Sequence, residues 1–144
     1  TLQRLKSKGL LDNVKGANLI YGSYDARLTP STLRQQGSDE IFLLSYEMIR
    51  KFRDSYFQDT LDLSLPDISP ILGDLSGMPP ALFTVGTRDL LLDDSLFMYG
   101  RWLSYGANAE IIIVPGADHA FNAFPSDTTT QVENKIYDFI KSVI

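Results

Sequence analysis

The chain of 144 residues contains no cysteine, a single histidine and no concentrated block of lysine and arginine. Without cysteine it can form no disulfide, no thiol nucleophile and no thiolate metal site, which is compatible with a cytoplasmic protein. No apolar run reaches the roughly 20 residues of a membrane-spanning helix, and the first residues do not form a signal peptide. With a net charge of −5 and no basic patch, the chain has no electrostatic support for nucleic-acid binding.

The amino-acid composition of the chain is typical of a globular domain. Apolar residues make up 44% of the chain and charged residues 22%, so we expect neither disorder nor low complexity. No internal repeat or linker divides the chain, and we expect residues 1–144 to belong to a single domain. The first residues lack a methionine and have the pattern of the second half of a helix. We therefore expect the chain to begin within a larger fold.

Three short apolar runs predict buried β-strands, because each is rich in β-branched or aromatic residues and is bounded by glycine or proline. These runs span residues 17–21, 81–87 and 109–114. Helical periodicity predicts helices over residues 44–59, 93–106 and 128–144. Polar residues with proline and glycine predict a loop over 26–40 and a long connection over 61–80.

Each predicted helix has an identifiable apolar face or end. Ser45 is expected to cap the first helix, whose apolar stripe would be formed by Met48, Phe52 and Tyr56. Gly106 is expected to end the second helix in a left-handed conformation, and acidic residues lie at the N-terminus of that helix. The last helix is expected to bury one face, formed by Val132, Ile136, Phe139, Ile140 and Val143.

Strands that are apolar throughout and alternate with helices predict an α/β fold, in which a parallel sheet is flanked by helices. A right-handed crossover would place the strands 81–87 and 109–114 side by side. No Gly-x-Gly-x-x-Gly or P-loop motif follows any predicted strand, which argues against a nucleotide-binding domain.

Two polar groups follow the carboxyl ends of these neighbouring strands, where open parallel sheets hold their ligands. Asp89 comes two residues after the strand 81–87, and His119, the single histidine, follows the strand 109–114 by a short turn. Adjacent strands lie about 5 Å apart, so the Asp89 carboxylate can accept a hydrogen bond from the His119 imidazole. The other ring nitrogen would then be free to take a proton from a nucleophile.

The stretch 74–125, "DLSGMPPALFTVGTRDLLLDDSLFMYGRWLSYGANAEIIIVPGADHAFNAFP", resembles the C-terminal half of the hormone-sensitive-lipase-like esterases, also called the α/β hydrolase fold-3 family. The segments "GANLIYGSYDARLTPS" and "LLSYEMIRKF" resemble that family's strand after the nucleophile helix and its cap helix. The resemblance implies the C-terminal part of an α/β-hydrolase fold with a partial cap at about residues 29–70. It also implies that the triad aspartate is Asp89 and the triad histidine is His119.

Two residues depart from the family pattern. Leu90 stands where the family usually has proline after the triad aspartate, and Ala120 stands where glycine usually follows the triad histidine. Ala120 places a methyl group where the backbone can require a positive φ angle.

The family's nucleophile elbow and oxyanion segment are absent from this chain, since no Gly-x-Ser-x-Gly occurs in it. The segment most similar to the Gly-x-Ser-x-Gly motif is "WLSYG". Its serine, Ser104, ends a predicted helix and follows Asp89 in the sequence, whereas the family's nucleophile precedes the aspartate, so we do not expect Ser104 to be a nucleophile. The resemblance thus implies a serine carboxylester hydrolase whose nucleophile lies outside this chain. The sheet would be incomplete on its N-terminal side, with an unpaired edge at 17–21.

The partner at that edge would be the missing half of the hydrolase or a second copy of the chain. The alternative function is an inactive interaction or self-assembly module that pairs through the open edge. A small-molecule ester is the substrate that the resemblance implies.

Candidate substrate-binding residues lie in the cap and after the strands. They are Tyr24, Phe42, Met48, Phe52, Leu90 and Phe121. The aromatic and methionine side chains of the cap could line an acyl pocket or simply pack the cap onto the body. No cofactor is implied. A divalent metal site at Asp89, Asp93, Asp94 and Asp118 is the weaker interpretation, because Asp93 and Asp94 are better explained as capping and first-turn acids of a helix.

Overall fold

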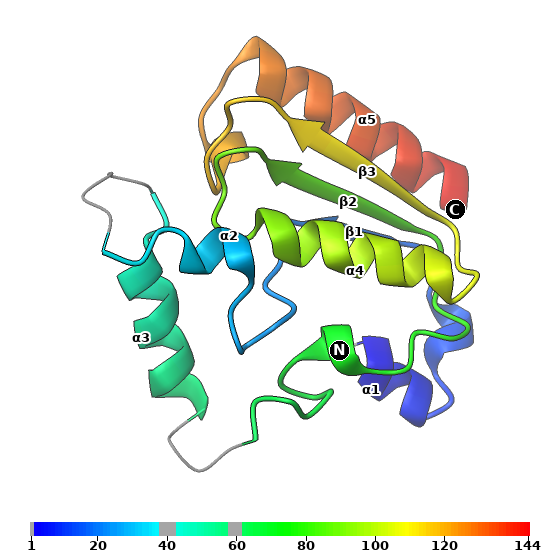
Figure 1. Cartoon of the computed structure of the whole chain (residues 1–144). Helices are drawn as coiled ribbons and strands as arrows, with labels where there is room; N and C mark the ends of the chain where they lie inside the picture. Colours follow the sequence, from blue (N-terminus) through cyan, green and yellow to red (C-terminus); the bar gives the residue numbers. More distant parts are fainter. Residues whose placement is uncertain (1, 38–42, 58–61) are drawn as a thin grey trace.

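The computed structural model describes residues 2–37, 43–57 and 62–144. A parallel sheet of three strands, β1 (Ala17–Ile20), β2 (Ala81–Gly86) and β3 (Ala109–Val114), lies between helices on its two faces (Figure 1). The longer helices are α3 (Tyr46–Phe57), α4 (Leu92–Ser104) and α5 (Asp127–Val143). Shorter elements are α1 (Leu2–Ser7), α2 (Pro30–Leu33) and the 3₁₀ turns η1 (Leu11–Asn13), η2 (Pro70–Leu72) and η3 (Phe121–Ala123). The α/β fold class with a parallel sheet is confirmed.

The strand order is β1-β2-β3, so β2 is the central described strand. Ala17 pairs with Ala81 and Ala81 with Ala109, which sets all three strands in one parallel register. The carboxyl ends of β2 and β3 therefore coincide, at Gly86 and Val114. This register brings the loops that follow the two strands together, as predicted.

The core lies mainly between the sheet and α4, whose buried residues recur on one helical face. Phe83 of β2 is fully buried, and its ring makes edge contacts with Tyr24, Tyr99 and Trp102 at centroid distances of 6.2, 6.0 and 5.7 Å. The Trp102 indole N–H donates to the Pro79 carbonyl (2.9 Å), which satisfies its polar atom inside the core.

Helix α5 covers the opposite face, where its buried residues include Val132 and Phe139. Ser126 caps α5 by accepting a hydrogen bond from the Thr129 N–H (3.0 Å). Ile140, expected on the inner face, is instead 37% exposed. Strand β3 was expected to be buried throughout, but Ile113 is 44% exposed, because among the described strands only β2 pairs with β3.

The cap region differs from the prediction in two ways. The segment 26–40, expected to be a loop, contains the short helix α2, with Pro30 at a favourable first position. In α3, Met48, Phe52 and Tyr56 are exposed, whereas Ile49 is buried. The predicted stripe is not the buried face of α3, because the contacts of the helix with Leu44, Leu90 and Leu91 select the face that carries Ile49. The predicted cap at Ser45 is confirmed by its hydrogen bond from the Met48 N–H (3.3 Å).

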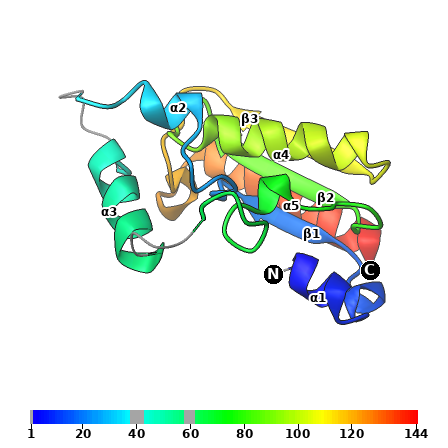
Figure 2. The same cartoon turned by 60° about the horizontal axis from the view of Figure 1, so that its bottom comes forward.

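Helix α3 stands apart from the sheet, beyond the carboxyl ends of the strands (Figure 2). The segment that leads to α3 crosses the start of α4, and the return connection packs Ile71 and Leu75 into the core. In the described part of the chain, no helix has both the length and the apolar character needed to cross a membrane.

Candidate active site

Asp89 lies in the turn after β2, and its side chain is completely buried. One carboxylate oxygen accepts from the Leu91 N–H (2.9 Å), and the other lies 2.9 Å from Nδ1 of His119. The Asp89 backbone is held as well, since its N–H donates to the Gly86 carbonyl and its own carbonyl accepts from Leu92 N–H. The carboxylate is therefore fixed in position without contact with solvent.

His119 lies in the loop between β3 and η3, with 22% of its side chain exposed. A carboxylate in its ionised form only accepts hydrogen bonds, so this contact favours the neutral tautomer with the proton on Nδ1, in which the lone pair of Nε2 is free. The ring of Tyr21, the first residue after β1, lies against the imidazole with 4.5 Å between ring centroids and 59° between ring planes. His119 is thus flanked by groups from the ends of β1 and β2.

Hydrogen bonds join the two loops that hold Asp89 and His119. The Arg88 N–H donates to the Ala117 carbonyl (3.0 Å), and the Gly116 N–H donates to the Thr87 hydroxyl (2.8 Å). Arg88 also forms an ion pair with Asp118 at 3.0 Å. At Gly86 a side chain would collide with the Ala117 carbonyl, so glycine permits this close approach. The geometry of the pair is set by the backbone around it.

Ala120, next to His119, adopts a left-handed conformation with φ 57° and ψ 26°. The expectation that this position requires a positive φ angle is confirmed. An L-residue with a Cβ atom is strained here by roughly 1–2 kcal/mol, whereas glycine is not. Leu28 and Tyr21 are the other non-glycine residues of positive φ in the described ranges 2–37, 43–57 and 62–144. Of the three, Ala120 adjoins His119 in the sequence and Tyr21 packs on the His119 ring.

Ala120→Gly is expected to raise the free energy of unfolding by about 0.5–1 kcal/mol, because the relief of strain exceeds the extra entropy of glycine in the unfolded chain. Urea unfolding followed by circular dichroism would measure the change. Ala123→Gly is the matched control: Ala123 lies in η3 without a positive φ angle, so the same substitution there is expected to destabilise. Equal destabilisation by both substitutions would contradict the assignment of strain to Ala120.

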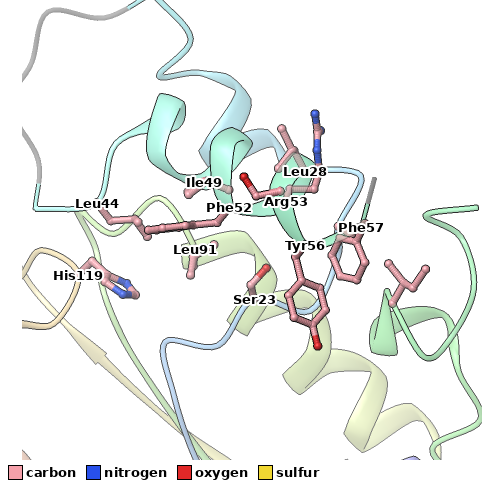
Figure 3. Close-up of a pocket in the computed structure, with 13 residues that line it drawn as sticks. Ser23, Leu28, Leu44, Ile49, Phe52, Arg53, Tyr56, Phe57, Leu91 and His119 are labelled. Carbon is pink, nitrogen blue, oxygen red and sulfur yellow. The ribbon is translucent and has the colours of Figure 1, made fainter. Parts of the chain in front are cut away.

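A pocket of about 650 Å³ opens beside His119, between the cap segment and the ends of the strands (Figure 3). His119 lies at one end of the pocket, and Tyr56 and Phe57 lie at the other. The remaining lining residues are mostly apolar and come from several segments: Ser23, Ala26, Leu28, Leu44, Ile49, Phe52, Arg53, Ser55, Ile68 and Leu91. Such a mostly apolar cavity with a histidine at one end suits a small organic molecule.

The predicted substrate-binding residues are distributed unevenly around this pocket. Phe52 lines it, but Met48 does not and is 41% exposed. Tyr24 packs on Phe83 in the core, and Leu90 is buried among Leu44, Ile49 and Leu91. Phe121 makes an edge contact with Tyr21 at 6.3 Å and does not line the pocket. Phe42 lies outside the described residues.

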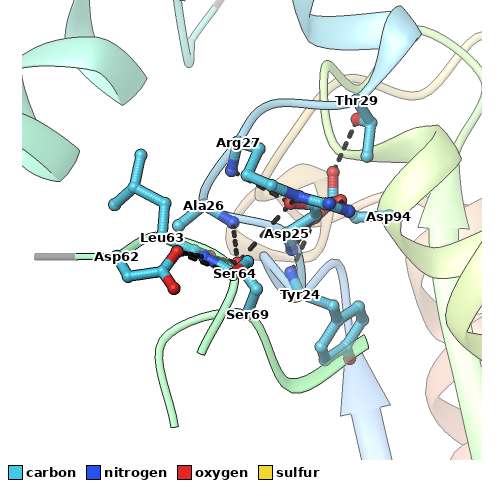
Figure 4. Close-up of polar contacts among 10 residues, drawn as sticks. All are labelled: Tyr24, Asp25, Ala26, Arg27, Thr29, Asp62, Leu63, Ser64, Ser69 and Asp94. Atoms are coloured by element: carbon cyan, nitrogen blue, oxygen red, sulfur yellow. Dashed lines mark hydrogen bonds and ion pairs between the residues drawn. The ribbon is translucent and has the colours of Figure 1, made fainter. Parts of the chain in front are cut away.

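Asp94 anchors the segment that carries the pocket wall (Figure 4). Its carboxylate is 1% exposed and accepts from the N–H groups of Tyr24 (2.6 Å) and Asp25 (2.9 Å) and from the Thr29 hydroxyl (2.7 Å). Burial raises the pKa of Asp94 above its usual value, although the hydrogen bonds from Thr29, Tyr24 and Asp25 act in the opposite direction. Asp93 and Asp94, expected as capping and first-turn acids, both lie in the first turn of α4, and no side chain caps the helix. The Asp94 carboxylate accepts from the backbone of another segment.

The remaining acids of the alternative metal site also have separate partners. Asp93 accepts from the Ser31 N–H (2.7 Å), Asp118 pairs with Arg88, and Asp89 contacts His119. In the part of the chain that the structure describes, no group of three or more acids or histidines is arranged to hold a metal ion. Ser104 lies at the end of α4, where its hydroxyl donates to the Arg101 carbonyl (2.8 Å).

Sequence reasoning missed Tyr21, Leu91 and Ser23 as neighbours of the site. Tyr21 was assigned to the strand itself, but β1 ends at Ile20, which leaves Tyr21 at the same edge of the sheet as Asp89 and His119. The signal that could have found it is its position: Tyr21 is the last residue of the predicted strand 17–21, at the carboxyl end, where the residues after the other strands also lie.

Comparison with known families matches residues 1–123 to the model of the alpha/beta hydrolase fold. Among curated proteins, an esterase of Acinetobacter venetianus is 38% identical over 80 residues, which are 56% of this chain and 26% of the esterase. The matching region therefore spans about a quarter of that relative.

Among solved structures, an esterase of Pyrobaculum calidifontis matches with a TM-score of 0.88 and 26% identity, covering 99% of this chain and 48% of the esterase. A hormone-sensitive lipase from a metagenome library matches with a TM-score of 0.89 and 26% identity, covering 99% of this chain and 49% of the lipase. The chain spans about half the length of these solved proteins.

Proposed function

Because the chain belongs to the α/β-hydrolase fold family, we propose that it supplies the aspartate and histidine of a serine carboxylester hydrolase. The observation that carries this proposal is the contact of 2.9 Å between the buried Asp89 carboxylate and Nδ1 of His119, beside an apolar pocket. The names of the similar proteins, esterase and hormone-sensitive lipase, support the same chemistry.

In the proposed reaction, Nε2 of His119 takes the proton of a serine hydroxyl while that oxygen attacks the ester carbonyl. The same nitrogen then gives the proton to the departing alcohol as the tetrahedral intermediate collapses to an acyl-enzyme. In the second half, His119 activates water in the same way, and the carboxylic acid leaves. Asp89 holds the ring in the Nδ1–H tautomer and stabilises the imidazolium that forms in each half.

The serine nucleophile and the oxyanion donors are proposed to come from outside these 144 residues, because no nucleophile elbow occurs in the sequence. Among the described strands, β1 pairs on one side only, which supports the addition of a further strand along its other edge. The segment 29–70, with α2 and α3, would act as part of the cap, and the pocket below it would receive one side of the ester.

A fluorophosphonate probe with intact-mass spectrometry tests this proposal on the purified protein that contains the chain. We expect one probe molecule on a serine outside residues 1–144, together with hydrolysis of p-nitrophenyl butyrate. Ser23 lines the same pocket as His119, so Ser23→Ala is the control and should leave labelling intact.

Two results would contradict the proposal in different ways. Probe attachment to Ser23, or His119-dependent turnover by the pure 144-residue chain, would place the nucleophile inside the chain. An absence of both labelling and ester hydrolysis from the protein that contains the chain would remove the esterase function itself.

A further inference from the structure

We infer that Tyr21 and Asn122 form a brace that holds the imidazole of His119 against Asp89, which makes Tyr21 a positioning residue of the site. This inference rests on the proposed function, because positioning has a purpose only if His119 transfers protons. Tyr21 is not part of the Asp–His pair. It directly follows β1, a strand that is not adjacent to β3, the strand before His119.

The need for a brace follows from the contacts of His119. A single hydrogen bond between Nδ1 and the Asp89 carboxylate fixes one atom of the ring but leaves the ring free to tilt about that bond. The Tyr21 ring restricts this motion, since its centroid lies only 4.5 Å from that of the imidazole. Asp89 and Tyr21 therefore restrain different motions of the same ring.

Tyr21 is held in turn by the loop that carries His119. Its phenol donates to the Asn122 side-chain oxygen at 2.6 Å, and Phe121 meets its ring at 6.3 Å. Burial and the nearby Asp89 charge raise the pKa of Tyr21, so the phenol keeps the proton that it donates. Tyr21 therefore contacts the same loop twice: its ring packs on His119, and its hydroxyl binds Asn122, which lies three residues further along the backbone.

The backbone conformation of Tyr21 supports the interpretation that its ring is directed toward His119. Its φ angle of 34° lies in the left-handed region, which is unfavourable for an aromatic residue. Its N–H still donates to the Thr84 carbonyl (2.7 Å), so the chain turns sharply after β1 without losing a sheet hydrogen bond. Packing of the ring in the core would not require this conformation. The conformation directs the Tyr21 ring over the end of β2 toward His119.

The brace can be tested in the protein that contains the chain, where the ring signals that disappear in His119→Gln belong to His119. Long-range ¹H–¹⁵N spectra of the labelled protein distinguish a protonated Nδ1 from an unprotonated Nε2. We expect His119 of the wild-type protein to populate one tautomer, with an Nδ1–H proton that exchanges slowly with water.

In Tyr21→Ala, the two ring nitrogens are expected to shift toward each other as the tautomers mix. Nδ1–H exchange should accelerate about fivefold, which corresponds to the loss of one aromatic contact. Tyr21→Phe and Asn122→Ala keep the ring over His119 but lose the hydrogen bond, and each should accelerate exchange about threefold. Their double variant should add nothing to either single variant, because both remove the same bond.

Tyr24→Ala is the matched control for loss of an aromatic residue, because Tyr24 packs on Phe83 and does not contact His119. It should lower stability and leave the His119 signals unchanged. The brace is overturned if Tyr21→Ala leaves both tautomer and exchange rate unchanged, or, should that variant not fold, if Tyr21→Phe and Asn122→Ala both do. Asp89→Asn separates this result from the proposed function: unchanged His119 signals in Asp89→Asn would contradict the Asp–His pair, whatever the Tyr21 variants show.

Discussion

His119→Ala is expected to lower kcat for ester hydrolysis by about 10⁶-fold in the protein that contains this chain. The chain holds no second histidine that could replace the lost base. The binding pocket and the oxyanion donors would remain, so the residual rate should stay above that of the uncatalysed reaction. Initial rates with p-nitrophenyl butyrate, compared at equal amounts of folded protein, would measure the loss.

Asp89→Asn should lower kcat by about 10⁴-fold, and for a different reason. The asparagine oxygen can still accept from Leu91 N–H, but its amide group donates to Nδ1 and thereby moves the ring proton to Nε2. A protonated Nε2 cannot accept the serine proton. Asp138→Asn makes the same chemical change on the exposed side of α5 and should leave the rate unchanged. A loss below tenfold for either His119→Ala or Asp89→Asn would contradict the proposed roles.

The central elements of the fold could be predicted because their local patterns have one interpretation. The run 81–87 is apolar at every position, and the matching strand β2 is buried at every position. Gly106, which follows α4, has a φ angle of 79°, as expected for a glycine that ends a helix in the left-handed conformation. The resemblance of residues 74–125 to the hormone-sensitive-lipase-like esterases is confirmed by the family match over residues 1–123.

The cap could not be predicted to the same level, because its orientation depends on contacts that are distant in sequence. In helix α3, Met48 and Ile49 are adjacent apolar residues that point in different directions, and only packing on Leu90 and Leu91 favours burial of Ile49. The same limit applies to the site. Asp89 and His119 follow strands that must be neighbours, whereas Tyr21 reaches His119 across the end of β2 through an unusual φ angle, which no local pattern signals.

Asp94→Ala is expected to lower the free energy of unfolding by about 3 kcal/mol, because it leaves several buried donors without an acceptor. These donors are the N–H groups of Tyr24 and Asp25 and the hydroxyl of Thr29. The segment that they anchor carries Ala26 and Leu28 of the pocket wall, so substrate binding should weaken together with stability. Asp94→Asn is the matched variant, since its oxygen can accept from both N–H groups and its amide can donate to the Thr29 hydroxyl.

The two Asp94 variants also predict how stability depends on pH. Burial raises the pKa of Asp94 in the folded chain, so in the range just above pH 3.8 the folded state binds more protons than the unfolded state. The contribution of Asp94 is therefore fully present below pH 3.8 and declines as the pH rises through the folded pKa. Asp94→Asn has no such decline, so the stability of Asp94→Asn relative to the wild type should increase between pH 4 and pH 7. Urea unfolding of both proteins at both pH values measures this difference. The contributions of the other carboxylates are the same in the two proteins and cancel in the comparison. A relative stability that decreases over this range would show that hydrogen bonding, not burial, dominates at Asp94.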